Sequence, residues 1–180
     1  MLKAGIVGAA GYAGAELVRI ILRHPEFELC VATSNSDEGT PLSSVYPAFT
    51  DVTNLTYSRH DNPELFNCDV VFLATPHTVA MKSAPGLLEA GVTVVDLSAD
   101  YRLRDRATYE QWYKVEHTSP ELLATATFGL PELNRQALAD AAARHAQGEA
   151  ILVACAGCYP TATSLAVAPV IELSQGIVVA

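Results

Sequence analysis

One cysteine near the end of the chain lies where a thiol can act as a nucleophile. Residues 155–161 (CAGCYPT) join an apolar, strand-like run to a helical pattern, and Pro160 suits the first turn of that helix. Cys158 is therefore expected at a helix N-terminus, whose partial positive charge favours the thiolate over the thiol. A thiolate there can attack an activated carbonyl and form a covalent acyl intermediate. Cys158 is thus the candidate catalytic residue.

The spacing of Cys155 and Cys158 also matches the C-x-x-C pattern of zinc sites and redox pairs. A zinc site needs two further ligands, and Cys30 and Cys68 form no second pair, so we expect no metal site. A thioredoxin-like pair usually lies earlier in its fold. A redox sensor that uses Cys155 and Cys158 remains an alternative function.

A glycine-rich turn near the N-terminus is the second chemical feature. The segment 8–14 (GAAGYAG) lies between a strand-like run and an amphipathic helical run. Glycines allow a tight turn and close backbone approach, and the following helix N-terminus presents free N–H groups to a phosphate. The spacing G-x-x-G-x-x-G is not the commonest one, but its place between strand and helix favours dinucleotide binding over a purely structural βα turn. The predicted cofactor contacts here are Gly8, Ala10, Gly11, Tyr12, Ala13 and Gly14.

The end of the next strand-like run bears on the choice of cofactor. NAD-binding domains usually place an acid there to bind the ribose hydroxyls. Here Thr33, Ser34 and Asn35 come first, and Asp37 and Glu38 follow. Hydroxyl and amide groups tolerate a 2′-phosphate, so NADP is the predicted cofactor, although no arginine stands ready to bind that phosphate. Ala74, Thr75 and Pro76 follow a third strand-like run and are predicted to border the same crevice.

The remaining polar residues give weaker signals. Asp96, Asp100 and Asp105 surround Ser98 and can orient a loop, although charged loop residues are mostly solvated. His24, His60 and His145 are expected in solvent, near helix ends or in polar loops. No histidine in the chain has the setting of a general acid–base partner for Cys158.

The elements that must position these residues alternate along the chain. Continuous apolar runs indicate strands that are buried on both faces, as in a parallel sheet covered by helices. The fold class is therefore predicted as α/β, with a doubly wound, mostly parallel sheet of the Rossmann type. The predicted strands are 4–8, 29–33, 70–74, 92–97, 151–154 and 177–179, and the predicted helices are 13–24, 78–90, 132–147 and 161–173.

The segment 99–130 interrupts this alternation. It contains Tyr101, Tyr109, Trp112, Tyr113 and Phe128 with interspersed charges and little regular periodicity. A segment of this length is either a structured functional loop or interface, or a packed cover over one edge of the sheet. The residues alone leave both interpretations open.

Composition excludes several classes of protein. The 180 residues are 50% hydrophobic and 17% charged, which is the balance of a folded domain, or of one domain with part of another. A formal net charge of −9 without a basic cluster argues against nucleic-acid and membrane partners. The uncharged stretch 150–171 contains Gly157, Pro160 and Pro169, so a strand, turn and helix explain it better than a membrane span. Without a secretory signal we expect a cytoplasmic protein.

Several motifs together resemble the N-acetyl-gamma-glutamyl-phosphate reductase family. They are the segments 8–17 (GAAGYAGAEL), 69–77 (DVVFLATPH), 96–103 (DLSADYRL), 128–133 (FGLPEL) and 157–162 (GCYPTA). The resemblance implies NADPH-dependent reduction of N-acetyl-L-glutamyl 5-phosphate, a small-molecule acyl phosphate, to the 5-semialdehyde in arginine biosynthesis. It implies that Cys158 attacks the acyl phosphate and forms a thioester that accepts hydride.

The sequence departs from the family in two respects. Cys155-Ala156 replaces the Asn-Pro or Val-Pro that usually precedes the glycine, and the family continues beyond Ala180 into a substrate domain with an acid–base histidine. We therefore expect an NADP-binding domain over 1–155, the nucleophile turn, helix and first strand of an incomplete second domain over 156–180, and a homo-oligomer at full length. The alternatives are another semialdehyde dehydrogenase and a non-enzymatic dinucleotide-binding module.

Overall fold

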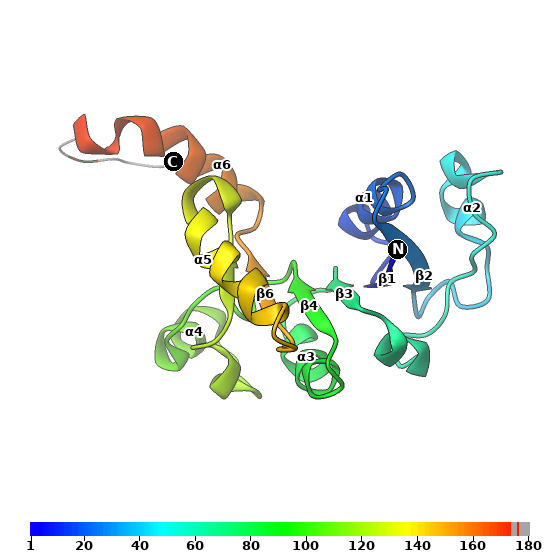
Figure 1. The fold of residues 1–180 in the computed structure, drawn as a ribbon, viewed down its shortest axis with the longest axis horizontal. Helices are drawn as coiled ribbons and strands as arrows, with labels where there is room; N and C mark the ends of the chain where they lie inside the picture. The colour runs from blue at the N-terminus through cyan, green and yellow to red at the C-terminus, as the bar shows by residue number, and fades with distance from the viewer. Residues whose placement is uncertain (174–175, 177–180) are drawn as a thin grey trace.

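The computed structural model describes residues 1–173 and 176 (Figure 1). Its sheet has six strands in the order β2-β1-β3-β4-β6-β5, and every pairing between neighbours is parallel. The strands are β1 (Leu2–Val7), β2 (Phe27–Thr33), β3 (Val70–Leu73), β4 (Thr93–Asp96), β5 (Thr127–Gly129) and β6 (Leu152–Cys155). The predicted parallel α/β class is confirmed, while the predicted strand at 177–179 lies outside the described residues.

Helices cover both faces of the sheet, as the doubly wound pattern requires. Figure 1 shows α1 and α5 on one face and α3 and α4 on the other. Each covered face has its own apolar cluster, one including Val18 and Ile21 of α1 and the other Met81 and Leu87 of α3. The helices are α1 (Tyr12–Ile21), α2 (Leu42–Val45), α3 (Ala80–Glu89), α4 (Arg106–Tyr113), α5 (Pro131–His145) and α6 (Cys158–Val167), followed by a 3₁₀ helix over Ala168–Leu173. The stretch 150–171 therefore forms a strand, a turn and helices, as predicted.

The segment 99–130 contains α4 and β5, which the sequence pattern did not predict. Tyr101 and Tyr109 are at most 2% exposed and belong to the apolar cluster under α3, so this segment is a packed cover. Trp112 is different, with 73% of its surface exposed. The strand β5 has only three residues and pairs with β6 at the edge of the sheet, so its existence depends on tertiary contact and not on local pattern.

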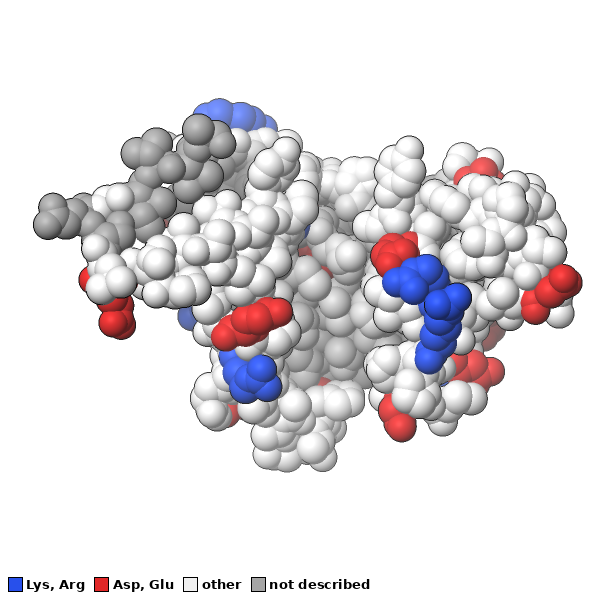
Figure 2. All heavy atoms as spheres, turned by 90° about the horizontal axis from the view of Figure 1, so that it is seen from above, with Lys and Arg blue, Asp and Glu red and all other residues white. Residues whose placement is uncertain are grey.

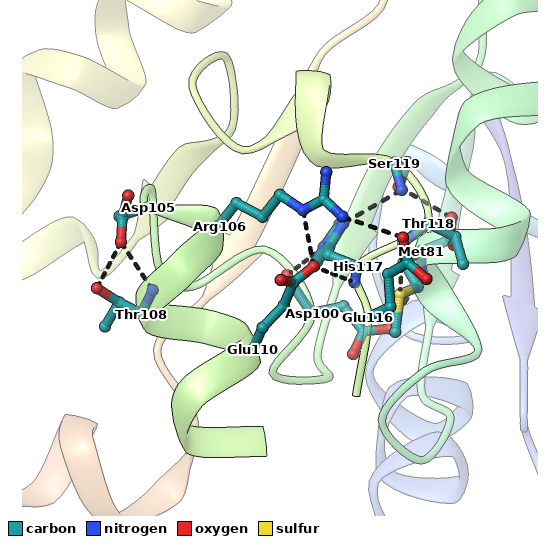
Figure 3. Close-up of polar contacts among 10 residues, drawn as sticks. All are labelled: Met81, Asp100, Asp105, Arg106, Thr108, Glu110, Glu116, His117, Thr118 and Ser119. Atoms are coloured by element: carbon teal, nitrogen blue, oxygen red, sulfur yellow. Dashed lines mark hydrogen bonds and ion pairs between the residues drawn. The ribbon is translucent and has the colours of Figure 1, made fainter. Parts of the chain in front are cut away.

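A buried carboxylate organises this cover. Asp100 is fully buried and accepts hydrogen bonds from the Thr78 N–H (2.8 Å), the Met81 N–H (3.0 Å) and the Tyr109 hydroxyl (2.9 Å). Thr78 lies just after the predicted cofactor segment and has a left-handed φ of 73°. The hydrogen bond from its N–H to Asp100 helps to stabilise this backbone conformation. Figure 3 shows His117 beside Asp100, its Nε2 donating to the Asp100 carbonyl at 2.8 Å.

The expectation that the loop carboxylates are solvated is wrong for two of the three. Asp96 and Asp100 are both fully buried, because backbone N–H groups and hydroxyls supply the hydrogen bonds that water would otherwise provide. Asp105 is exposed, and it caps α4 by accepting the Thr108 N–H at 2.7 Å. Figure 3 shows this cap and, further along α4, the contacts of Arg106 with Glu110 and Glu116.

Two apolar surfaces are left uncovered by the residues that the structure describes. On the face that carries α5, a trough of about 300 Å³ lies beside that helix, and Figure 2 shows a largely uncharged hollow on this side of the molecule. Its floor includes Phe27, Phe72, Val95 and Val153. The helix α6 buries none of its residues, although it is rich in apolar side chains. Among the described residues, no helix is both long and apolar enough to cross a membrane.

Candidate active site

Topology brings the predicted site residues to one edge of the sheet. All six strands run parallel, so the loops after β1, β2, β3, β4 and β6 leave from the same edge. The chain places β2 on one side of β1 and β3 on the other, which creates the crevice where α/β proteins bind ligands. The glycine-rich turn, the Thr33–Asn35 segment, the Ala74–Pro76 segment and Cys158 all lie on this edge.

The glycine-rich turn has no room for side chains. A Cβ on Gly14 would lie 2.2 Å from the carbonyl oxygen of Gly8, and a Cβ on Gly8 would lie 2.4 Å from that of Ala74. Gly8 also has a φ of 86°, which favours glycine. Gly11 is the N-cap of α1, and no side chain caps that helix, so its first N–H groups remain available to a phosphate. Tyr12 and Ala13, at the start of α1, are exposed.

A groove of about 490 Å³ opens beside this turn and brings together five of the predicted residues. They are Gly8, Ala10, Gly11, Ser34 and Asn35, and the other lining residues are Ser36, Asp37, Val45 and His60. Thr33 is buried behind the groove, where its carbonyl accepts the Ala9 N–H at 2.8 Å. The expectation that His60 is solvated is wrong, because its ring is half-buried and its Nδ1 lies 2.7 Å from the Thr33 hydroxyl.

The segment after β3 borders the turn from the other side. The Ala74 N–H donates to the Val7 carbonyl at 2.8 Å, which holds this segment against the end of β1. Thr75 Oγ1 is buried and has no hydrogen-bond partner. Among the described residues, Tyr57 Oη is the one other buried side-chain polar atom without a partner. Pro76 and His77 are exposed. The glycine cradle and the unpartnered Thr75 hydroxyl together fit a dinucleotide that lies across the end of β1.

The nucleophile turn follows β6. Gly157 has a φ of 85° and is the N-cap of α6, while Cys158 is the first residue of that helix and is exposed. Arg102 links this turn to the end of β4. Its Nε donates to the Cys155 carbonyl at 2.7 Å and its Nη2 donates to the Leu97 carbonyl at 2.8 Å. A Cβ on Gly157 would lie 2.6 Å from Arg102 Nη1, so the glycine lets the guanidinium approach. Arg102 was not among the predicted site residues, although it lies in the motif 96–103.

The two cysteines of the C-x-x-C pair have different environments. Cys155 is half-buried, and burial is the main cause that raises the pKa of its thiol. It therefore stays protonated at neutral pH, which makes it a poor nucleophile. This burial disfavours the redox-pair alternative and leaves Cys158 as the accessible thiol.

The buried carboxylate of Asp96 lies at the end of β4. Burial raises its pKa to about 6, against the opposing effect of hydrogen bonds from the Ser98 hydroxyl (2.9 Å) and N–H (2.8 Å). A group whose pKa is raised by folding contributes stability that is fully present below its unfolded pKa and is lost as the pH rises through the folded value.

We therefore expect the free energy of unfolding of the wild-type protein to fall between about pH 4 and pH 7. The fall should exceed that of an Asp96→Asn variant by about 2 to 3 kcal/mol. Urea denaturation of both proteins across this range measures the difference. Asp105→Asn is the control, because hydrogen bonds from Thr108 lower the pKa of Asp105 and its effect has the opposite sign. Parallel curves for wild type and Asp96→Asn would contradict the prediction.

The fold and the site together define an α/β domain of the dinucleotide-binding class, with a cysteine-bearing turn on the edge that carries the cofactor groove. Residues 3–141 match the family described as "Semialdehyde dehydrogenase, NAD binding domain". The chain belongs to this family.

Curated relatives are similar over nearly the whole chain. The N-acetyl-gamma-glutamyl-phosphate reductase of Herminiimonas arsenicoxydans is 48% identical over 172 residues, which are 96% of this chain and 47% of the relative. The reductase of the same name from Halorhodospira halophila is 46% identical over 100% of this chain and 51% of its own length. The chain thus spans about half the length of the curated relatives it matches.

Several solved structures of semialdehyde dehydrogenases share the fold. An aspartate semialdehyde dehydrogenase with NADP from Candida albicans has a TM-score of 0.63 at 20% identity, covering 86% of this chain and 42% of that one. Aspartate semialdehyde dehydrogenase II from Vibrio cholerae has a TM-score of 0.65 at 18% identity, covering 96% of this chain and 43% of that one. At these identities the likeness concerns the fold.

Proposed function

We propose that this chain provides the cofactor groove and the nucleophile of an NADPH-dependent reductase in arginine biosynthesis. The reaction converts N-acetyl-L-glutamyl 5-phosphate to N-acetyl-L-glutamate 5-semialdehyde and releases phosphate. The observation that carries the proposal is the position of Cys158, exposed at the N-terminus of α6 on the same edge of the sheet as the glycine cradle. The names of the relatives support the choice of acyl phosphate.

Cys158 is the nucleophile, exposed at the first position of α6. Its sulfur attacks the acyl carbon, the bond from that carbon to the phosphate oxygen breaks, and phosphate leaves with the bonding electrons. A thioester on Cys158 results. NADPH, held by the residues of the groove, would supply the hydride for reduction of this thioester. Reduction would break the bond between the acyl carbon and Cys158 Sγ and release the aldehyde. Arg102 holds the turn during both steps through the Cys155 carbonyl.

The residues around the groove suit the parts that NADPH shares with NADH. The uncapped N-terminus of α1 offers N–H groups to the pyrophosphate. Ser34 and Asn35 lie on the ribose side, and the unpartnered Thr75 hydroxyl offers a hydrogen bond further along the crevice. Tyr12, Ala13, Ala74 and Pro76 complete the proposed binding set. The Candida albicans enzyme, which shares the fold and whose structure is described as one with NADP, supports this choice of cofactor.

We also propose that residues 1–155 form the cofactor domain and that 156–180 begin a second domain. The apolar helix α6 buries no residue against the sheet, as expected for a helix that packs on something else. We propose a cytoplasmic homo-oligomer for the full-length enzyme, in which the remaining half also supplies the general acid–base.

The reverse reaction tests the function. The full-length protein, incubated with N-acetyl-L-glutamate 5-semialdehyde, phosphate and NADP⁺, is expected to form NADPH only when all three are present, and nicotinamide absorbance measures this. Aspartate semialdehyde serves as the competing substrate. Faster turnover of aspartate semialdehyde would assign the chain to another semialdehyde dehydrogenase, and binding of cofactor without turnover of either aldehyde would favour a non-enzymatic binding module.

A further inference from the structure

Asp37 lines the cofactor groove, and it is the one ionised side chain that does so in the part of the chain that the structure describes. Asp37 lines it together with Ser34, Asn35 and Ser36. The remaining titratable lining residue is His60, whose pKa is lowered chiefly by burial, so it is neutral at pH 7. A ligand in this part of the groove therefore meets a negative charge and no opposing positive one.

Two hydroxyls bind this carboxylate. Asp37 Oδ2 accepts hydrogen bonds from the Ser34 hydroxyl at 2.6 Å and the Ser36 hydroxyl at 2.7 Å. These bonds lower the pKa of Asp37, which is thus ionised at neutral pH. They also use the protons that the two serines would otherwise donate to a phosphate. The Ser34 hydroxyl, one of the groups that made the sequence appear suited to a 2′-phosphate, is therefore committed to Asp37.

The basic side chain next to the groove residue His60 does not offset this charge. Arg59 pairs with Asp61 at 3.2 Å and with Glu38 at 3.8 Å, and it does not line the groove. Its positive charge is thus balanced by two exposed carboxylates. The local field at the end of β2 is negative, in agreement with the net charge of −9 for the whole chain.

The position of Asp37 relates it to the ribose of a bound dinucleotide. In Rossmann-type domains the pyrophosphate lies at the glycine turn, and an acid about 20 residues further along the chain binds the ribose hydroxyls. Asp37 lies four residues past the end of β2 and shares one groove with Gly8 and Gly11, so its carboxylate is on the side of the groove where this ribose would lie. A carboxylate accepts hydrogen bonds from ribose hydroxyls, and it repels a phosphate at the same position.

We infer that Asp37 determines the cofactor preference of this groove, supporting the ribose of NADH and weakening the binding of NADPH. The inference rests on the proposed dinucleotide function and concerns its selectivity. The protein accordingly binds both cofactors, and the charge of Asp37 keeps the advantage of NADPH small.

Titration of NADPH and NADH into wild type and Asp37→Asn tests the inference. Asparagine keeps an acceptor for Ser34 and Ser36, removes the charge and adds an N–H donor for a phosphate. We expect NADPH affinity to rise roughly fivefold to tenfold, and NADH affinity to stay constant or fall. The affinities of adenosine 2′,5′-bisphosphate and AMP are compared in the same way, because these two compounds differ in the 2′-phosphate and lack the nicotinamide half. Asp37→Ser is a second variant, and it should shift the ratio in the same direction because it also removes the charge.

Glu38→Gln is the matched control, because it removes one negative charge from the next residue, which does not line the groove. It is expected to change neither affinity by more than about twofold. An unchanged NADPH-to-NADH ratio in Asp37→Asn and Asp37→Ser, or an equal shift in Glu38→Gln, would overturn the role of Asp37. Failure of wild type to bind either cofactor would instead overturn the proposed dinucleotide function.

Discussion

Replacing Cys158 with serine is expected to lower the rate of acyl-phosphate reduction by about a thousandfold or more in the full-length enzyme. A serine hydroxyl ionises far less readily than a thiol, so serine at this position is a much weaker nucleophile. The residue is exposed at the first position of α6, and exchange of one atom there removes no packing contact from the core.

Cofactor binding separates loss of chemistry from loss of structure. The Cys158→Ser variant is expected to bind NADPH with nearly the affinity of wild type, since the glycine cradle lies on a different loop. Cys155→Ser is the matched control: this half-buried thiol is held protonated, so its replacement should leave most of the activity. Retained turnover in Cys158→Ser, or equal loss in Cys155→Ser, would contradict the assigned nucleophile.

The second large effect is expected at Gly14, which an alanine cannot replace. The new Cβ would lie 2.2 Å from the Gly8 carbonyl oxygen and 2.7 Å from Ala9 Cα. Both are backbone atoms, so the turn itself must shift. Alanine has the better helix propensity, by about 1 kcal/mol, but a clash of this kind outweighs it. We expect the free energy of unfolding to fall by about 3 kcal/mol and NADPH affinity to drop at least about tenfold.

Gly11→Ala is the control for stability. A Cβ on Gly11 would lie 3.5 Å from the Gly8 carbonyl oxygen, an ordinary contact, and the backbone there is extended. Its free energy of unfolding should change by less than about 1 kcal/mol. Urea denaturation measures both variants. Equal stability of Gly14→Ala and wild type would show that the turn tolerates a side chain and that the cradle is not rigid.

The alternation of apolar runs and helical patterns was sufficient to predict the fold class. The strands β1–β4 and β6 are local features, each with its own apolar run, whereas their order in the sheet is known only from the structure. The tight turn after β1 could also be predicted, because Gly8 and Gly14 are glycines at positions where any side chain would clash with the backbone.

Residues whose roles depend on distant partners could not be predicted in this way. The burial of Asp96 and Asp100 requires donors that folding assembles around them, and a carboxylate in a loop segment carries no local sign of this. Arg102 reaches the Cys155 carbonyl, 53 positions further along the chain. His60 lines the groove, and its ring is positioned by the contact between its Nδ1 and the Thr33 hydroxyl. Each of these depends on the packed sheet.

The order of the last strands has a consequence for how the chain assembles during synthesis. β5 (Thr127–Gly129) pairs with β6 (Leu152–Cys155), and β6 also pairs with β4. β5 leaves the ribosome before β6, so it has no strand partner until β6 has been made. The pairing of Val94 with Leu152 joins residues further apart in the sequence than the pairing of Thr127 with Val153, so we expect the contact between β4 and β6 to carry the larger loop-closure cost in folding.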